Sequence, residues 1–292
     1  MKPELFGHTS YFVLWVVGAI VGVWTATRAA RHAGFPGGRS LCAACALALA
    51  IVLGSKLLFL FEHALLPADA TLVWEQGDLR HVLRFGFRIP GGIVLMALVL
   101  PLLCRRLRLA ALPFADAILP GVGIALFFIR VGCLLNGCCF GAVTASPLAI
   151  TFPAGAQVYG WQLASGLIAP GATRTVPVHP LQAYFALMGL ALFVLSRHWQ
   201  RTKRLDGQVW FNFNLVFFGA SFFLELLRPQ PLRLNLALCA AVLMITVVLR
   251  SWRRQPVVAL GALSPTPSTT LRASPERVGG TGLSQGAREG VS

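Results

Sequence analysis

The segment from Arg130 to Gly141 holds the greatest density of residues that could bind a charged ligand. It reads Arg-Val-Gly-Cys-Leu-Leu-Asn-Gly-Cys-Cys-Phe-Gly and follows the apolar run 127–129. A guanidinium in such a setting usually has a partner or a function, and an anionic headgroup is a suitable ligand for Arg130. The glycines and Asn136 suit irregular backbone whose N–H groups could hold a phosphate. An alternative stays open, because Gly137 and Gly141 also have the spacing of small residues that pack membrane helices.

A second polar group opens a later apolar segment as His179-Pro180-Leu181-Gln182-Ala183-Tyr184. This spacing puts an imidazole, an amide and a phenol near one end of the expected helix. His179 is the best-placed titratable base in the chain, and a positioned base is what proton abstraction from a nucleophile requires. The alternative is that His179 and Tyr184 are interfacial residues of a membrane helix.

Two more charges interrupt apolar runs, at Glu225 and at Lys56. Glu225 precedes Arg228 by three residues, so it can bind a ligand or act as a counter-ion for Arg228 or Arg130. Those two arginines could also extend their side chains to the interface. We expect Lys56 to be structural.

Cysteines occur in an odd number and are spread over the apolar segments, unlike a secreted disulfide framework. They are Cys42, Cys45, Cys104, Cys133, Cys138, Cys139 and Cys239. Cys133, Cys138 and Cys139 could form a disulfide or, with His179, bind a metal. Because this spacing alone is a weak signal, we expect no metal site and no cofactor.

The composition indicates which elements position these groups. Of the 292 residues, 56% are hydrophobic and 12% are charged, and the mean hydropathy is +0.71. A soluble globular chain has about 25% charged residues. This apolar surplus therefore predicts an integral membrane protein. The net charge of +15 raises the question of nucleic-acid binding, but the bases lie between apolar runs rather than on a soluble module, which excludes it.

Apolar segments long enough to cross a bilayer occur seven times, which predicts an all-α, polytopic membrane protein. The expected spans are Tyr11–Ala29, Leu41–Phe61, Gly91–Cys104, Phe114–Ile129, Pro180–Leu195, Gln208–Leu227 and Leu232–Leu249. The first span is followed, not preceded, by a cluster of arginines, so we interpret it as retained rather than as a cleaved signal peptide.

Basic residues near the span ends gather on alternate loops, as they do on the cytoplasmic side of membrane proteins. These bases are Arg28, Arg31, Arg39, Arg105, Arg106, Arg108, Arg197, Arg201, Lys203, Arg204, Arg250, Arg253 and Arg254. The sorting predicts an N-terminus outside and a C-terminus in the cytoplasm. We expect a membrane domain over 1–255, with outer loops at about 64–90 and 131–178, and a disordered cytoplasmic tail over 256–292.

Over about residues 7–250 the chain resembles the bacterial prolipoprotein diacylglyceryl transferase family. The segment Arg130 to Gly141 is similar to its signature R-x-G-x-x-x-N-G-x-x-x-G, the segment His179 to Tyr184 to its H-P-x-Q-x-Y, and Glu225 with Arg228 to its E-x-x-R. The resemblance implies an enzyme that moves a diacylglyceryl group from phosphatidylglycerol to the lipobox cysteine thiol of a prolipoprotein. It also implies a location in the bacterial cytoplasmic (inner) membrane, with phosphatidylglycerol, the prolipoprotein signal peptide and membrane lipids as partners.

The resemblance also implies site residues, with Arg130 at the position of the headgroup-binding arginine and Tyr11 at that of an early functional tyrosine. The expected substrate-binding residues are Arg130, Asn136, Gly141, Gln182, Glu225 and Arg228, and the expected catalytic residues are His179, Tyr11 and Tyr184.

The chain departs from the family pattern at two positions. Pro90 replaces a histidine before the Gly91-Gly92 pair, and Ser221 replaces an arginine four residues before Glu225. We therefore expect that His179, or the phenol of Tyr11 or Tyr184, serves as the base, or that the substrate brings a thiol already favourable for ionisation. The alternative is a non-catalytic relative that binds lipid or lipoprotein. A transporter or channel is disfavoured, because no span carries a repeated row of polar residues.

Overall fold

The computed structural model describes residues 4–5, 8–65, 87–229 and 233–254, and these contain seven helices long and apolar enough to cross a membrane. The long helices are α1 (Ser10–His32), α2 (Gly37–Leu65), α4 (Ile89–Leu107), α5 (Ala111–Asn136), α7 (Leu181–Thr202), α8 (Gln208–Leu226) and α9 (Arg233–Arg254). A short helix, α6 (Gln157–Ala164), lies between α5 and α7 in the chain, and β1 (Glu4–Leu5) pairs with β2 (His8–Thr9) in an antiparallel hairpin. The predicted all-α, multi-pass membrane architecture is confirmed.

The fourth span is longer than its apolar run indicated. We expected it to end at Ile129 and the outer loop to begin at 131, but α5 continues to Asn136. Leu134 and Leu135 extend the helix, and Gly137 ends it in the left-handed conformation with φ 67°. Arg130 therefore lies inside the last two turns of α5 rather than at its end.

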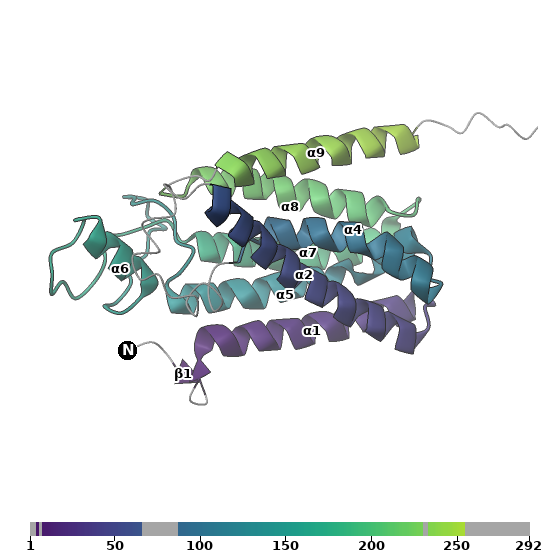
Figure 1. Cartoon of the computed structure of the whole chain (residues 1–292), viewed down its shortest axis with the longest axis horizontal. Helices are drawn as coiled ribbons and strands as arrows, with labels where there is room; N and C mark the ends of the chain where they lie inside the picture. The colour runs from purple at the N-terminus through teal and green to yellow at the C-terminus, as the bar shows by residue number, and fades with distance from the viewer. Residues whose placement is uncertain (1–3, 6–7, 66–86, 230–232, 255–292) are drawn as a thin grey trace, which may run out of the picture. The chain divides into compact units, whose positions relative to one another are not determined.

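Helix α5 packs along α1 and α7 through small residues (Figure 1). A Cβ atom at Gly123 would lie 2.6 Å from the backbone nitrogen of Phe193, and one at Gly189 would lie 2.8 Å from that of Phe127. Without side chains at these two positions, the backbones of α5 and α7 come close enough for extensive van der Waals contact, which holds membrane helices together. Gly123 and Gly189 therefore align the two helices that carry the candidate site.

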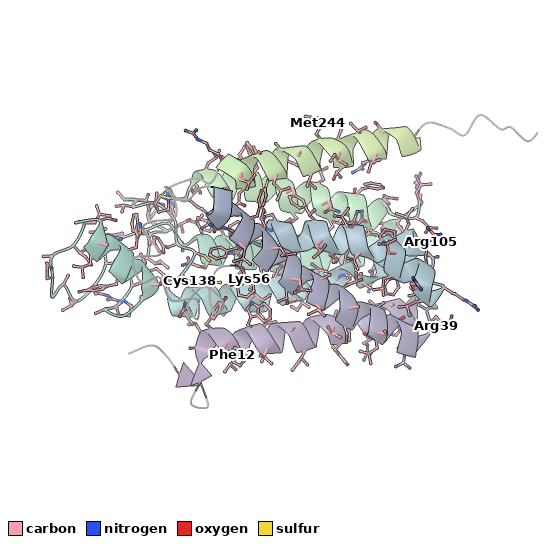
Figure 2. All side chains as sticks on the ribbon, viewed as in Figure 1. Phe12, Arg39, Lys56, Arg105, Cys138 and Met244 are labelled. Atoms are coloured by element: carbon pink, nitrogen blue, oxygen red, sulfur yellow. The ribbon has the colours of Figure 1, made fainter. Side chains whose placement is uncertain are left out.

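The two ends of the bundle differ in charge. Arg39 and Arg105, from the basic loops, lie at one end, and Cys138 lies toward the other (Figure 2). Arg39 and Arg105 thus lie away from the Arg130–Gly141 segment, and the orientation of the termini stays a prediction. The expected outer loop at 64–90 falls mostly outside the described residues, as does the whole tail at 256–292, so the disorder of the tail stays a prediction.

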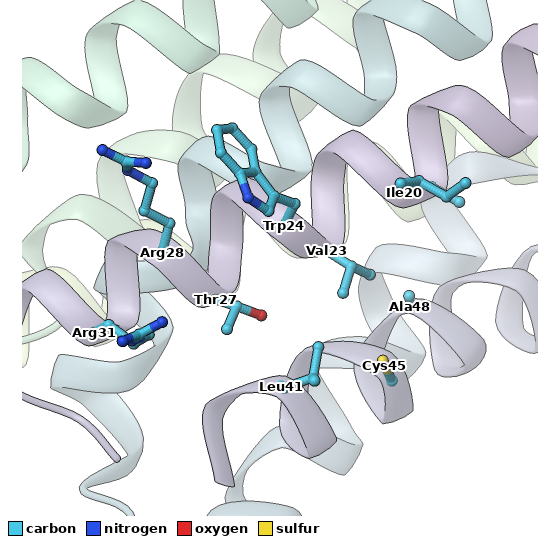
Figure 3. Close-up of a pocket in the computed structure, with 10 residues that line it drawn as sticks. Ile20, Val23, Trp24, Thr27, Arg28, Arg31, Leu41, Cys45 and Ala48 are labelled. Carbon is cyan, nitrogen blue, oxygen red and sulfur yellow. The ribbon is translucent and has the colours of Figure 1, made fainter. Parts of the chain in front are cut away.

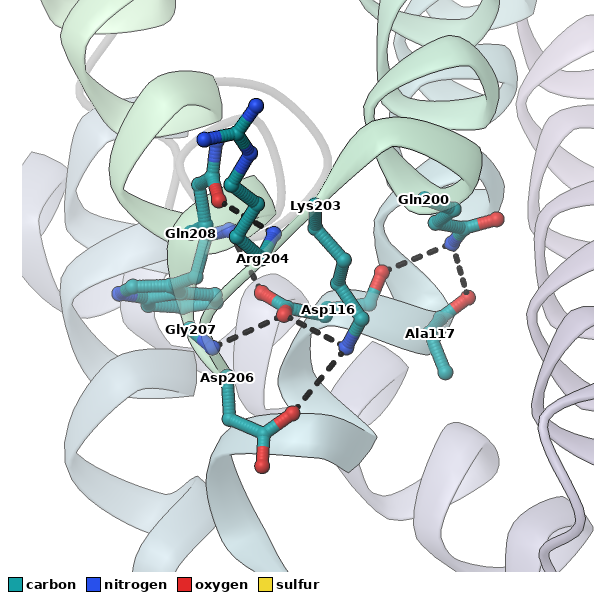
Figure 4. Close-up of polar contacts among 9 residues, drawn as sticks. Asp116, Ala117, Gln200, Lys203, Arg204, Asp206, Gly207 and Gln208 are labelled. Atoms are coloured by element: carbon teal, nitrogen blue, oxygen red, sulfur yellow. Dashed lines mark hydrogen bonds and ion pairs between the residues drawn. The ribbon is translucent and has the colours of Figure 1, made fainter.

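Asp116 organises the basic end of the bundle (Figure 4). Its carboxylate, 1% exposed, accepts hydrogen bonds from the backbone N–H groups of Gly207 at 2.8 Å and Trp210 at 2.9 Å and binds Lys203 Nζ at 3.0 Å. It thereby caps the N-terminus of α8 from another helix, where a negative charge is favourable. Because Pro120 lacks an N–H group, the Asp116 carbonyl loses its helical partner, and Gln200 Nε2 supplies a hydrogen bond at 2.8 Å.

We expect Asp116→Ala to lower the free energy of unfolding by about 3 kcal/mol, because it leaves Lys203 and two N–H groups without their carboxylate. Thermal unfolding in detergent measures the loss. The control is Asp206→Ala, since the Asp206 carboxylate also binds Lys203 but is 61% exposed. Equal melting temperatures for the two variants would contradict the role of Asp116.

Candidate functional site

A short irregular segment, residues 138–142, joins three helices at the end opposite Asp116. Gly141 N–H donates to the His179 carbonyl at 2.9 Å, and His179 N–H donates to the Ala142 carbonyl at 3.0 Å. Ala142 N–H donates to the Leu227 carbonyl at 2.8 Å. The segment that follows α5 is thus hydrogen-bonded to the start of α7 and to the end of α8.

Gln182 and Gly141 hold this segment in place. The buried Gln182 side chain donates from Nε2 to the Cys138 carbonyl at 2.7 Å. A Cβ atom at Gly141 would lie 2.6 Å from His179 Cβ, so only glycine allows the two backbones to pair this closely. Gly137 and Gly141 therefore serve the turn and the backbone pairing, and the alternative that they form a helix-packing stripe is wrong.

Arg130 is buried, with 7% of its surface exposed, and its guanidinium lies over the Phe185 ring at 4.3 Å from the centroid. A cation above an aromatic face is stabilised without losing its charge. In the described part of the chain, Arg130 Nε has no hydrogen-bond partner. A buried donor without a partner has a strong affinity for an anion.

The thiols of Cys133, Cys138 and Cys139 meet beside Arg130, with their sulfur atoms all within 4.8 Å of one another. Cys139 adopts a left-handed backbone conformation with φ 57°, which few non-glycine residues adopt. Cys138 Sγ also donates to the Cys133 carbonyl at 3.7 Å.

Hydrogen bonds from Cys133 and Cys138 hold the pKa of the Cys139 thiol well below its usual range, and the charges of Arg130 and Arg228 act in the same direction against burial. The pKa of Cys138 is raised by its hydrogen bonds to the other two thiols and by burial. Cys139 is therefore the first of the three thiols to ionise, and the cluster favours negative charge on sulfur.

Glu225 and Arg228 form an ion pair near the cluster. Arg228 Nε donates to Glu225 Oε2 at 2.8 Å, and Asn235 Nδ2 donates to Glu225 Oε1 at 3.4 Å. Of the two counter-ion alternatives, the structure thus pairs Glu225 with Arg228. The pair also orients α9 against the end of α8 through Asn235.

The expected catalytic residues are His179, two residues before α7, Tyr184 on α7 and Tyr11 on α1. The rings of His179 and Tyr184 lie 6.4 Å apart, and among the described residues His179 Nδ1 has no hydrogen-bond partner. Tyr11, near the start of α1, is close enough to Arg130 and the three thiols to interact with them electrostatically. Candidate residues from α1, α5, α7 and the segment after α8 therefore come together at one end of the bundle.

The chain is similar to known proteins over most of its length. The family model described as prolipoprotein diacylglyceryl transferase matches residues 6–252. The chain belongs to this family. A Clostridium perfringens relative, named phosphatidylglycerol--prolipoprotein diacylglyceryl transferase 2, is 27% identical over 234 residues, covering 78% of this chain and 82% of the relative. A Clostridium tetani relative named phosphatidylglycerol--prolipoprotein diacylglyceryl transferase is 25% identical, covering 79% and 87% of the respective chains.

The two positions at which the chain departs from the family motifs, Pro90 and Ser221, lie on α4 and α8. Pro90 lies in the first turn of α4, where its missing N–H group is harmless, and it cannot act as a base. Ser221 is buried in α8, and its hydroxyl has no hydrogen-bond partner within the described ranges. With no arginine at 221, Arg228 is the second guanidinium whose charge acts on the thiol cluster.

Asn136 and Lys56 are two further polar residues that the sequence analysis singled out. Asn136 is the last residue of α5, and no hydrogen bond in the described part of the chain joins its amide to the other candidates. Lys56 lies over the rings of Phe59 and Phe87, with its Nζ 5.2 Å and 4.9 Å from their centroids. This placement fits the structural role expected for Lys56.

Sequence reasoning missed Phe185 and Asp116. Phe185 directly follows the His179–Tyr184 motif, and its ring lies beneath the Arg130 guanidinium. The only sequence signal for this contact was an aromatic residue next to the motif. Asp116 is a charged residue within an apolar span, which the sequence shows. Its partners at the start of α8 are 91 and 94 residues away in the chain, so the sequence did not indicate what it binds.

A groove of about 660 Å³ between α1 and α2 lies away from these residues (Figure 3). Its lining includes Ile20, Trp24, Arg28, Leu41 and Cys45, and none of the expected site residues takes part. The groove faces the lipid-exposed side of α1, where Trp24 is 60% exposed, so we do not assign the chemistry to it.

We expect Gly141→Ala to lower the free energy of unfolding by about 1–3 kcal/mol, because its methyl group collides with His179 Cβ and separates the paired backbones. Chemical or thermal unfolding in detergent measures the change. Gly160→Ala is the matched control, since a Cβ atom at this exposed helical position meets nothing within 4 Å. If both variants are as stable as the unmodified chain, the close pairing at Gly141 is refuted.

Proposed function

We propose that this chain transfers a diacylglyceryl group from phosphatidylglycerol to the lipobox cysteine thiol of a prolipoprotein. The observation that carries the proposal is the buried Arg130 guanidinium, whose Nε has no partner among the described residues, next to a cluster of thiols and His179. Membership of the prolipoprotein diacylglyceryl transferase family supports the same reaction.

Arg130 binds the phosphate of the lipid donor in this proposal. The Phe185 ring holds the guanidinium plane in one orientation, which leaves its N–H groups to donate to phosphate oxygens. Arg228 adds a second positive charge, partly balanced by Glu225. A phosphate ester becomes a better leaving group when its developing negative charge meets such fixed donors.

The acceptor thiol attacks the glycerol carbon that carries the phosphate ester. A carbon–sulfur bond forms, the carbon–oxygen bond to phosphate breaks, and glycerol phosphate leaves with the electron pair. His179 accepts the thiol proton, since its Nδ1 is without a partner in the described structure. The phenols of Tyr11 and Tyr184 orient the reacting groups, and Gln182, Gly141 and Asn136 shape the segment around the donor.

The proposed site lies on the outer side of the bacterial cytoplasmic membrane. The alternation of basic loops predicts an N-terminus outside and a C-terminus in the cytoplasm. The site end is opposite Arg39 and Arg105, so a two-tailed donor reaches it laterally from the outer leaflet. The prolipoprotein signal peptide brings its lipobox cysteine to the same depth.

Purified chain in phosphatidylglycerol liposomes should add a diacylglyceryl group to a lipobox peptide, as measured by the mass of the peptide. We expect Arg130→Gln to slow transfer by about 100-fold or more, because it removes the charged donor to the phosphate. Arg105→Gln, an exposed arginine at the opposite end, should leave the rate unchanged.

An active family member serves as the positive control in the same liposomes. If it modifies the peptide and this chain does not, the enzymatic proposal is rejected. Equal rates for Arg130→Gln and the unmodified chain would reject the assignment of Arg130 as the phosphate-binding residue.

His179→Gln should lower kcat by about 100-fold or more while the KM for phosphatidylglycerol changes little, because glutamine cannot accept the proton. His198→Gln, an exposed histidine near the far end of α7, is the control and should retain full kcat. A normal kcat for His179→Gln would assign proton abstraction to another group.

A further inference from the structure

The three clustered thiols have the geometry of a metal site. In a tetrahedral zinc site the Zn–S distance is about 2.3 Å, which puts neighbouring sulfur atoms about 3.8 Å apart. The sulfur atoms of Cys133, Cys138 and Cys139 are already within 4.8 Å of one another. Small side-chain rotations would therefore bring all three into contact with one ion. A disulfide would join two of them and leave the third sulfur without a role.

The backbone around the cluster is organised to present sulfur. Cys138 and Cys139 are adjacent, and neighbouring side chains of an extended segment point to opposite sides. The left-handed conformation of Cys139, with φ 57°, breaks this alternation and allows both thiols to face Cys133 on the last turn of α5. Gln182 holds the Cys138 carbonyl from α7 and so restrains the turn.

The charges around the cluster suit a three-thiolate site. Three thiolates and one Zn²⁺ carry a net charge of −1, which needs a cationic environment at this depth. Arg130 and Arg228 supply it, since both act electrostatically on Cys139. Soft thiolate ligands select zinc over hard cations such as Mg²⁺.

The fourth coordination position is open. Within the described ranges, no histidine, aspartate or glutamate atom joins the three sulfur atoms in the cluster. Of the three residues, Cys139 is only partly buried, whereas Cys133 and Cys138 are buried. Zinc sites with three protein ligands keep the fourth position for water or substrate.

We propose that Cys133, Cys138 and Cys139 hold one Zn²⁺, whose fourth position binds the thiol of the acceptor peptide as a thiolate. The second half of this inference rests on the proposed transferase function. Zinc lowers the pKa of a bound thiol, and the proton that leaves passes to His179. The bound sulfur then attacks the glycerol carbon, glycerol phosphate departs, and zinc keeps its three cysteine ligands. The ion assists deprotonation in a chain where Pro90 stands at the position of the family histidine.

Titration with Co²⁺, a coloured probe for zinc sites, tests the inference on the full chain in detergent, reduced with a phosphine rather than a thiol. We expect one Co²⁺ per chain, with sulfur-to-cobalt charge-transfer absorption that Zn²⁺ abolishes by competition. Cys139→Ser and Cys133→Ser should each weaken binding by at least about tenfold. Cys104→Ser, a buried cysteine on α4 outside the cluster, should bind like the unmodified chain.

A lipobox peptide should shift the visible Co²⁺ bands, whereas the same peptide with serine in place of its cysteine should not. If the reduced, unmodified chain binds no stoichiometric Co²⁺, or if Cys104→Ser weakens binding as much as Cys139→Ser, the site is overturned. If neither the cysteine peptide nor the serine peptide shifts the Co²⁺ bands, the assignment of the fourth position is overturned.

The two proposals fail in different ways. If the chain binds Co²⁺ and responds to the cysteine peptide but transfers no lipid, the metal-site proposal stands and the transferase proposal fails. If the chain transfers lipid but binds neither Co²⁺ nor Zn²⁺, the transferase proposal stands and the metal-site proposal fails.

Discussion

Backbone hydrogen bonds between residues 138–142 and the helices on either side are the constraint on which the candidate site depends. They connect the end of α5 to His179 at the start of α7 and to Leu227 after α8. Backbone groups at membrane depth must find partners within the protein, so an irregular segment is tolerated there only when neighbouring elements supply them. The pairing of Gly141 with His179, together with the amide of Gln182, meets that requirement and also fixes where the thiols and the imidazole stand.

The site concentrates groups that are costly to bury unless they have a ligand or a partner. Arg130 rests on Phe185 with an unpartnered Nε in the described structure, while Arg228 is paired with Glu225. One guanidinium is therefore available for an anion and the other is held in place by a carboxylate. Three thiols beside them gain from the same positive potential, since both arginines favour ionisation of Cys139. An anionic donor and a sulfur nucleophile thus find favourable electrostatics in one place.

The opposite end of the bundle has a structural role. Asp116 uses its carboxylate to cap α8, and Gln200 replaces the backbone hydrogen bond that Pro120 removes from the Asp116 carbonyl. The capping oxygens are fully paired, in contrast to the unpartnered polar atoms of Arg130, His179 and Gln182 in the described part of the chain. A satisfied buried network stabilises a fold, whereas unsatisfied groups at a site are available for a substrate. In the sequence, Asp116 and Arg130 are both charged residues within apolar spans. The structure distinguishes them, because the Asp116 carboxylate is fully hydrogen-bonded and Arg130 Nε is not.

The sequence by itself determined the seven apolar spans and the two motifs, because each is a property of a short contiguous segment, and it left Arg228 and Arg130 as alternative partners of Glu225. Span lengths follow from bilayer thickness, and a three-residue spacing on a helix already allows an ion pair. The tertiary structure alone decided that Arg130 lies within α5 above Phe185, that Cys139 turns toward Cys133, and that Asp116 caps α8. The contacts of Gln182 with Cys138 and of Asp116 with Trp210 join residues 44 and 94 positions apart, so they arise only once the helices have packed.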